Sequence, residues 1–312
     1  MQPVERRNIS DVEMAQYIAA FWHIHSYLLR IGCPDRAAWL LSSAHDYANS
    51  WLYVSRNSSS WFSGSSSYLT DKEYSHSLCN LLLIRSPNAV ALGSRCLCVV
   101  QYNLPADRIP SNTPYHHLDC IATKCFRSFC HSEISRAVTH YVKKRIPNIA
   151  IAQTPHIQRR NTAQNNTQIL MADLVVTPAD RSGMYIDFTV GNPAAPSYYD
   201  TTDPNLSSSK LMHSTNRARE LLKLQKYSTA VNDIVQRKMF VPFAVESTGR
   251  IGERAMSYLL DLFPRDARGF TKAVPLIKQI GIILARYNAR AGLYMSKRQL
   301  EARGDGGADG GG

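Results

Sequence analysis

Apolar and polar positions alternate along this chain in two different ways, and the change divides it into two regions. In the first region, apolar residues recur with helical spacing over residues 11–30 and 35–55, which predicts two amphipathic helices. Thr70 and Glu73 then have the spacing of a capping box and predict the start of a short third helix. We therefore expect residues 1–90 to form a helical region whose role is packing.

The second region mixes helical periods with short apolar runs. In chain order the pattern predicts helix 132–145, strand 148–154, a polar loop with Arg159 and Arg160, strands in the runs ILMADLVVTP and GMYIDFTVGNP, helix 210–235, strand FVPFAVES, and helices 253–263 and 271–298. This order is typical of an α/β fold with a small mixed sheet flanked by helices. We assign that domain to residues 131–303, with a linker over 91–130 and a disordered Gly-rich tail over 304–312.

Two carboxylates lie inside the two adjacent apolar runs. Asp173 belongs to the first run and Asp187 to the second, and the turn-like segment ADRSG joins the runs as in a hairpin. An acidic side chain in an apolar strand is costly to bury unless it is paired or binds a metal. A shared Mg²⁺ would relieve the repulsion between two such groups and would suit phosphodiester hydrolysis. The alternative is that Asp173 faces solvent and Asp187 caps a turn.

A predicted helix supplies candidate partners for these carboxylates. Lys223 and Tyr227 are four residues apart and share one helix face, whereas Lys226 is rotated by roughly 100° from Tyr227. We therefore predict that Lys223 points toward the aspartates and stabilises a transferring phosphate. Its alternative role is as part of a solvated basic face. Glu133, on the helix before the first strand, is a candidate third acidic ligand.

The charge of the chain points to a polyanionic partner. There are 36 Lys and Arg residues against 24 Asp and Glu, a formal net charge of +12, which would attract DNA and possible element RNA. No apolar run reaches membrane-spanning length and the first residues lack a signal-peptide core, so we expect an intracellular protein without a membrane partner. Our candidate phosphate-binding residues are the arginines and lysines of two basic segments: Arg159, Arg160, Arg286, Arg290, Lys297 and Arg298.

Seven short motifs occur in an order that resembles a known family. They are HHLDC, HSEISRAV, ADLVV, IDFTVGNP, RARELLKLQKY, FVPFAVESTGR and ERAMSYLLDL. The series resembles the C-terminal region of eukaryotic retrotransposon reverse-transcriptase proteins, with a restriction-endonuclease-like core of the PD-(D/E)xK type. That resemblance implies that Asp173 and Asp187 bind the metal and that Lys223 and Tyr227 belong to the catalytic helix. Thr189 stands where the strand lysine of such nucleases usually stands.

The same resemblance implies a zinc knuckle, of which this chain keeps part. His116 and Cys120 match its second half, but the usual Cys-x-x-Cys pair is missing. Cys96 and Cys98 are candidate substitutes for that pair, and Cys125 or Cys130 could also serve, since a structural zinc site needs four nitrogen or sulfur ligands. The cofactors expected from the sequence are therefore Mg²⁺ and, at a degenerate knuckle, Zn²⁺.

The sequence supports three functional hypotheses. The first is a metal-dependent endonuclease that nicks target DNA in the nucleus for a retroelement, although no Tyr-x-Asp-Asp-like polymerase centre is present. The second is a catalytically inactive remnant that still binds nucleic acid. The third is a purely structural α/β module. Metal-dependent nicking distinguishes the first hypothesis from the second, and salt-sensitive DNA binding distinguishes the second from the third.

Overall fold

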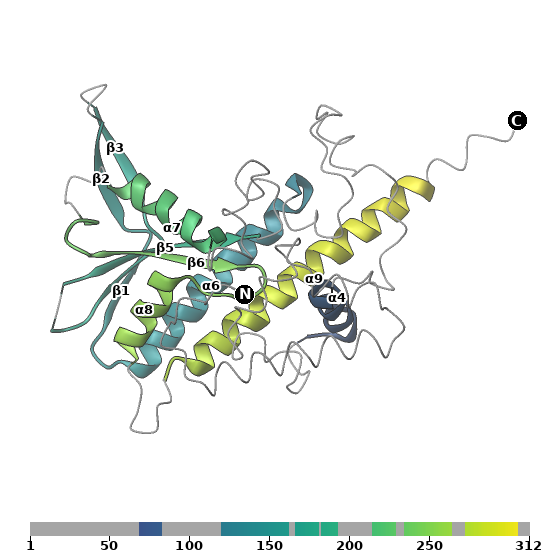
Figure 1. Ribbon diagram of the computed structural model, residues 1–312, viewed down its shortest axis with the longest axis horizontal. Coiled ribbons are helices and arrows are strands. Elements are labelled where there is room, and N and C mark those ends of the chain that lie inside the picture. The colour runs from purple at the N-terminus through teal and green to yellow at the C-terminus, as the bar shows by residue number, and fades with distance from the viewer. Residues whose placement is uncertain are drawn as a thin grey trace, which may run out of the picture.

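The structure is a computed structural model, and it describes residues 69–82, 120–161, 166–180, 182–192, 214–228, 234–263 and 272–304. These residues form a mixed α/β fold around a small sheet (Figure 1). The elements in chain order are α4 (Asp71–Leu82), the 3-10 helix η5 (Ile121–Thr123), α6 (Lys124–Arg145), β1 (Ala150–Gln153), β2 (His156–Asn161), β3 (Asn166–Met171), β4 (Leu174–Thr177), β5 (Met184–Gly191), α7 (Ser214–Tyr227), β6 (Phe240–Glu246), α8 (Glu253–Leu262) and α9 (Val274–Gly304).

The main sheet has the strand order β1-β4-β5-β6. Strand β4 is antiparallel to both β1 and β5, while β6 runs parallel to β5 and reaches it through α7. The expected hairpin between the two apolar runs is confirmed, because Leu174 pairs with Ile186 and Val176 with Met184. The predicted mixed sheet flanked by helices is therefore present in the described residues.

Helices cover both faces of this sheet. Apolar side chains of β4, β5 and β6 form one core with α6, α8 and α9. On the opposite face, α7 packs through Tyr227 against Phe240 and the β2–β3 hairpin. Figure 1 shows α7 on the side of the sheet away from α8 and α9. Since Ile186 and Phe188 belong to the first core, the intervening Asp187 faces α7.

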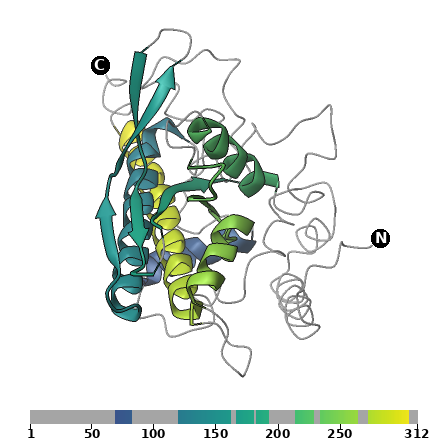
Figure 2. The same cartoon turned by 90° about the vertical axis from the view of Figure 1, so that its left-hand side faces the viewer.

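The first apolar run is not a single strand as predicted. Strand β3 ends at Met171 and β4 begins at Leu174, with Ala172 and Asp173 at the junction. Opposite this junction, Thr154 has a φ of 48° and its N–H donates to the Asp173 carbonyl over 2.9 Å. The antiparallel ribbon bends here, so that β2 and β3 leave the main sheet as a separate hairpin (Figures 1 and 2).

The polar segment expected to be a loop is part of that hairpin. Arg159 and Arg160 lie on β2, paired with Gln168 and Thr167 of β3. The prediction of a loop was wrong because neither strand has an apolar face continuous enough to signal a strand by itself. Residues 156–161 are a strand because they pair with β3 through backbone hydrogen bonds.

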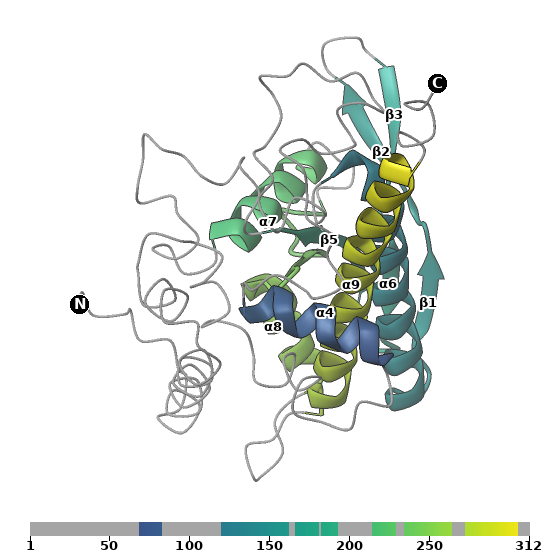
Figure 3. The ribbon, with the colours of Figure 1, turned by 90° about the vertical axis from the view of Figure 1, so that its right-hand side faces the viewer.

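Helix α4 confirms the predicted capping box and shows where the helix packs. The Thr70 N–H donates to Glu73 Oε2 over 2.9 Å, and the Glu73 N–H donates to Thr70 Oγ1 over 3.3 Å. The helix lies across α9 (Figure 3). A side chain at Gly292 would overlap His76, so glycine permits this close approach.

The remaining helices agree with the pattern except at their ends. Helix α6 starts at Lys124, eight residues before the predicted start at residue 132, and α7 is shorter than the predicted range 210–235. The helices predicted over 11–30 and 35–55 lie outside the described residues. None of the helices within the described ranges has an apolar stretch sufficient to cross a bilayer.

Candidate functional site

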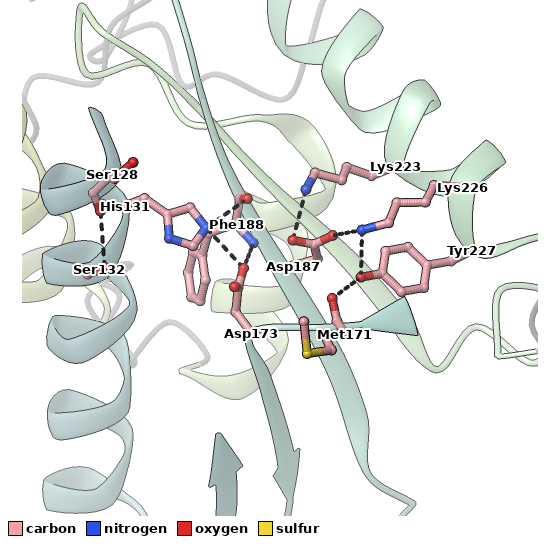
Figure 4. A network of polar contacts seen from close by, with 10 residues as sticks. All are labelled: Ser128, His131, Ser132, Met171, Asp173, Asp187, Phe188, Lys223, Lys226 and Tyr227. Carbon is pink, nitrogen blue, oxygen red and sulfur yellow. Dashed lines mark hydrogen bonds and ion pairs between the residues drawn. The ribbon is translucent and has the colours of Figure 1, made fainter. Parts of the chain in front are cut away.

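Two aspartates and a histidine converge where β4 and β5 meet α6. Asp173 lies at the β3–β4 junction, Asp187 lies on β5, and His131 reaches them from α6 (Figure 4). One ligand atom from each of the three residues lies within 4.8 Å of the others. The structure therefore brings together the two aspartates that the sequence singled out, and it adds a histidine that the sequence analysis did not name.

Asp173 is fixed by two donors. Its Oδ2 accepts a hydrogen bond from the Phe188 N–H over 2.6 Å and lies 3.1 Å from His131 Nε2. Burial acts to raise the pKa of Asp173, but the hydrogen bond and positive charge of His131 outweigh it, so this pKa is lowered. The same hydrogen bond raises the pKa of His131. Both shifts favour the ion pair between a protonated His131 and an ionised Asp173.

Asp187 is more deeply buried and has a different environment. The residue is 4% exposed, and its Oδ1 accepts a hydrogen bond from Lys223 Nζ over 2.9 Å. Burial and the neighbouring Asp173 raise the pKa of Asp187, while the Lys223 charge lowers it; the net shift is upward. Its Oδ2 is buried and has no hydrogen-bond partner among the described residues. Lys226 Nζ lies 3.7 Å from that oxygen, an ion-pair distance, so a cation bound there would compete with this lysine.

The helix α7 places three side chains around Asp187. The prediction that Lys223 points to the aspartates is confirmed by its contact with Asp187. The prediction that Lys226 points away is wrong, because its flexible side chain extends over the Tyr227 ring and brings Nζ within 3.7 Å of Asp187 Oδ2. The buried Tyr227 hydroxyl donates to the Met171 carbonyl over 2.6 Å.

Glu133 does not belong to the group of ligand atoms. Its carboxylate pairs with Arg136, one turn further along α6. The third member is instead His131, two residues earlier, which is 42 positions from Asp173 in the chain. Residues two apart on a helix lie on different faces, which is why only one of these two side chains can reach the aspartates. The sequence signal for His131 was its place at the head of the motif HSEISRAV.

The predicted zinc site falls largely outside the described residues. Cys96, Cys98 and His116 lie there, and only Cys120 can be placed. Its side chain is buried against Met295 and Ala122 in a small apolar cluster. Within the described ranges, the His131–Asp173–Asp187 group is the one set of three metal-ligand side chains that the geometry assembles.

The predicted phosphate-binding residues have several environments. Arg290 Nε donates to Glu73 Oε1 over 2.6 Å and so ties α9 to α4; its role in binding phosphate stays a prediction. Lys297 and Arg298 both pair with Glu301 on their own helix, at 3.9 and 3.3 Å. Arg286 is half-buried on α9. The backbone places Arg159 and Arg160 on the projecting hairpin.

A cavity of about 620 Å³ adjoins the metal-ligand group. His131, a member of the group, lines the cavity, and so does Lys223, which contacts Asp187. The wall is formed by α6, α7, α9 and the carboxyl end of β5. Burial raises the pKa of the neighbouring Cys130 to about 12, so this thiol stays protonated and is unsuited to act as a nucleophile.

The residues of the site fit a divalent cation. Carboxylate oxygens are the ligands preferred by Mg²⁺ and Mn²⁺, and an imidazole nitrogen extends the choice toward Mn²⁺ or Zn²⁺. Two features support such a fit: the Oδ2 of Asp187 accepts no hydrogen bond from the described residues, and the three donors lie close together. A cation would compete with Lys223 and with the proton of His131 for these ligands.

We also compared the sequence with protein-family models and with curated proteins. Neither comparison found a match to this chain. The resemblance to retrotransposon proteins with a restriction-endonuclease-like core accordingly stays a prediction from the quoted motifs. The geometry of the site is therefore the basis on which a function is inferred.

Proposed function

We propose that this chain is a divalent-metal-dependent DNA endonuclease of a retroelement-derived protein, which nicks target DNA in the nucleus by phosphodiester hydrolysis. The observation that carries the proposal is the convergence of His131, Asp173 and Asp187 within 4.8 Å. The Lys223 ammonium contacts the same group and also lines the adjoining cavity. His131 and Lys223 line this cavity, and the two carboxylates lie directly behind them. A pair of carboxylates, a histidine and a lysine beside one cavity match the needs of phosphate hydrolysis.

Each side chain has a distinct task in this proposal. Asp173, Asp187 and His131 would hold a Mg²⁺ or Mn²⁺ ion, which would supply the acidification of water and the neutralisation of phosphate charge. Lys223 stabilises the negative charge that develops as the water oxygen bonds to phosphorus and a phosphorus–oxygen ester bond breaks. Thr189 cannot carry that charge, and Lys223 supplies it from α7.

Tyr227 acts as a positioning residue. Its ring is fully buried, and its hydroxyl binds the Met171 carbonyl at the end of β3, next to the Asp173 junction. Burial and the charge of Asp187 raise the pKa of Tyr227, so the phenol remains protonated. A protonated, buried phenol fixes the backbone beside the site and does not serve as a base.

One observation favours the alternative of an inactive nucleic-acid-binding remnant. Asp187 is balanced by Lys223 and Lys226, and Asp173 by His131. The carboxylate charges are thus compensated by the chain's own cations. In this alternative the protein binds nucleic acid through its positive field and does not cut it.

A nicking assay separates the two functions. Supercoiled plasmid is incubated with the full chain and Mg²⁺ or Mn²⁺, and relaxation is measured for the wild type, Asp187→Asn and Asp261→Asn. Asp261 is an exposed aspartate on α8 and serves as the matched control. We expect metal-dependent nicking by the wild type and the control, and loss of at least a hundredfold in Asp187→Asn.

The opposite results have clear meanings. Nicking that continues at the full rate in Asp187→Asn would show that another site, or a contaminant, cuts the plasmid. Plasmid binding without nicking by the wild type in either metal would favour the inactive remnant. Circular dichroism of Asp187→Asn shows whether the fold survives the substitution.

A further inference from the structure

The cavity beside the metal-ligand group combines three kinds of side chain. The first is cationic and lies on two walls. Arg219 and Lys223 are four residues apart on α7, roughly 6 Å along one helix face, and Lys124 and Arg127 line the cavity from α6. Cations spaced along a wall in this way suit successive phosphates of a nucleic-acid strand.

The second kind of side chain is aromatic. Phe126 of α6 and Tyr287 of α9 both line the cavity and are both partly exposed. The Phe126 ring packs against Tyr294 with centroids 5.5 Å apart, which holds its orientation. Partly exposed rings beside cations are the usual platform on which an unpaired base stacks.

The third kind is a set of hydrogen-bonding groups at the carboxyl end of β5. Asn192 and Ser247 are 5% and 7% exposed, and Ser247 Oγ donates to Asn192 Oδ1 over 3.5 Å. Asn288 Nδ2 donates to the Ser247 carbonyl over 2.8 Å, which fixes its amide. Buried amides and hydroxyls can read the hydrogen-bonding edge of a base.

Strand β5 connects the metal-ligand group to Asn192, which directly follows it, while Ser247 follows the neighbouring β6 and Asn288 lies on α9. Phe188 is next to the metal-ligand group and Asn192 is four residues on, a distance of about 13 Å along an extended strand. The wall of the cavity thus includes both residues beside the metal-ligand group and hydrogen-bonding groups. The volume of about 620 Å³ is within the roughly 300–1,000 Å³ of ordinary ligand sites.

We propose that this cavity binds one unpaired nucleotide of the DNA strand next to the phosphate that is cut. The base stacks on Phe126 and meets the Asn192–Ser247–Asn288 groups, while the cations of α6 and α7 hold the flanking phosphates. A paired base cannot enter, because its faces and its edge are occupied in the duplex. The inference rests on the proposed function and gives it a substrate class: DNA with unpaired bases at the cleavage position.

Photocrosslinking tests the position of the base directly. A duplex carrying a single unpaired 5-iododeoxyuridine is irradiated with the full chain without divalent metal, and the crosslinked peptide is identified by mass spectrometry. We expect crosslinks in the α6 segment that contains Phe126, and at least tenfold fewer crosslinks when the same base is paired. The yield should fall at least tenfold in Phe126→Ala and be retained in Phe126→Tyr, which keeps the ring.

Phe129 provides the matched control. It lies three residues further on the same helix, is 58% exposed and does not line the cavity. Phe129→Ala should therefore crosslink like the wild type. Crosslinks that depend on Phe129, or that are equal for paired and unpaired bases, would overturn the inference. Retention in Phe126→Tyr shows that loss in Phe126→Ala comes from the missing ring, even if the alanine variant is less stable.

The metal-free design separates this inference from the proposed function. Crosslinking of the unpaired base at Phe126 in Asp187→Asn supports the nucleotide site even where nicking is lost. If the wild type nicks paired and unpaired substrates at equal rates and gives no crosslink at Phe126, the nuclease proposal stands and the nucleotide site is refuted. Faster nicking beside the unpaired base, by tenfold or more, supports both.

Discussion

Asp187 is the side chain of the site that has the most charged neighbours. It is almost fully buried, it lies near a second carboxylate, and two lysines approach it from α7. A buried carboxylate without compensation costs several kcal/mol, so Lys223 and Lys226 stabilise the fold in the absence of a cation. Of the two, Lys223 is the candidate for charge stabilisation in the proposed nuclease.

The two lysines should differ in their effect on nicking. Lys223 Nζ is 2.9 Å from Asp187 and lines the cavity, whereas Lys226 is 3.7 Å away and more exposed. We expect Lys223→Ala to reduce the nicking rate by about 10²- to 10³-fold. Lys226→Ala should reduce it by less than about tenfold, because exposed charges are screened.

Single-turnover nicking and filter binding measure these effects separately. DNA affinity should change little in either variant, since one phosphate contact among many contributes a small part. A rate that depends on Lys226 and not on Lys223 would show that the roles are reversed. Equal loss of DNA affinity and of nicking in Lys223→Ala would mean that this lysine binds the strand and does not act in the chemical step.

At the scale of elements, the sequence predicted what short apolar runs encode. The β4–β5 hairpin and the strand β6 were found because buried strands need continuous apolar residues. The β3–β4 junction at Asp173 was hidden, because the run ILMADLVVTP reads as one strand although its two halves join different sheets. The local apolar pattern does not indicate that β3 pairs with β2 whereas β4 pairs with β1 and β5.

His131 is the residue of the candidate site that the sequence did not predict. The two aspartates and Lys223 were found from residue type and spacing, but the histidine is 42 residues from Asp173. It reaches the site because α6 begins at Lys124 and packs against β5. The cavity likewise depends on α6, α7 and α9 together, and no segment taken singly predicts it.

Helix α8 depends on a carboxylate from another helix. Its N-cap, Gly252, offers no side chain, and the Arg254 N–H donates instead to Glu220 Oε1 of α7 over 3.1 Å. A side chain at Gly252 would overlap that carboxylate. Burial raises the pKa of Glu220 to about 7, and the charge of Glu253 adds a smaller rise. The Arg254 N–H and the charges of Arg254 and Arg217 act in the opposite direction.

The raised pKa predicts how stability changes with pH. Between its ordinary pKa of 4.5 and about 7, Glu220 holds a proton in the folded protein that the unfolded chain has released. Its contribution to stability therefore falls as pH rises through that window. Replacing Glu220 by glutamine should flatten the decrease of the thermal midpoint between pH 4.5 and about 7.

Thermal unfolding followed by circular dichroism measures this slope. Glu301→Gln is the control, because Glu301 is exposed near the end of α9 and should leave the slope unchanged. The slope of the wild type also contains Glu246, whose pKa burial raises to about 6 in the same direction. An identical slope in Glu220→Gln and the wild type would contradict the raised pKa of Glu220 in the folded protein.

For the whole molecule, the proposed association with DNA depends on charge. The formal net charge is +12. Part of the positive charge of α9 is neutralised by ion pairs, of Arg290 with Glu73 and of Lys297 and Arg298 with Glu301. These pairs keep the predicted basic helix from acting as a single positive surface. The cationic groups around the cavity are the better candidates for holding a strand.

Binding to DNA should accordingly weaken steeply with salt. We expect affinity in filter binding to fall with a linear slope of log affinity against log salt, because phosphate contacts release counterions. Replacing Arg127 or Arg219 by alanine should lower that slope by about one, whereas Arg290→Ala should leave it unchanged. No retention at low salt would remove both the nuclease and the remnant proposals.

The central claim is that His131, Asp173 and Asp187 hold one divalent cation, and titration calorimetry with Mn²⁺ tests it most directly. The full chain and Asp261→Asn should each bind one Mn²⁺ ion with the same affinity, and Asp187→Asn should bind it at least about tenfold more weakly, because one of the two carboxylate ligands is lost. Mn²⁺ binding of equal strength in Asp187→Asn, or no binding by the wild type, would contradict the claim.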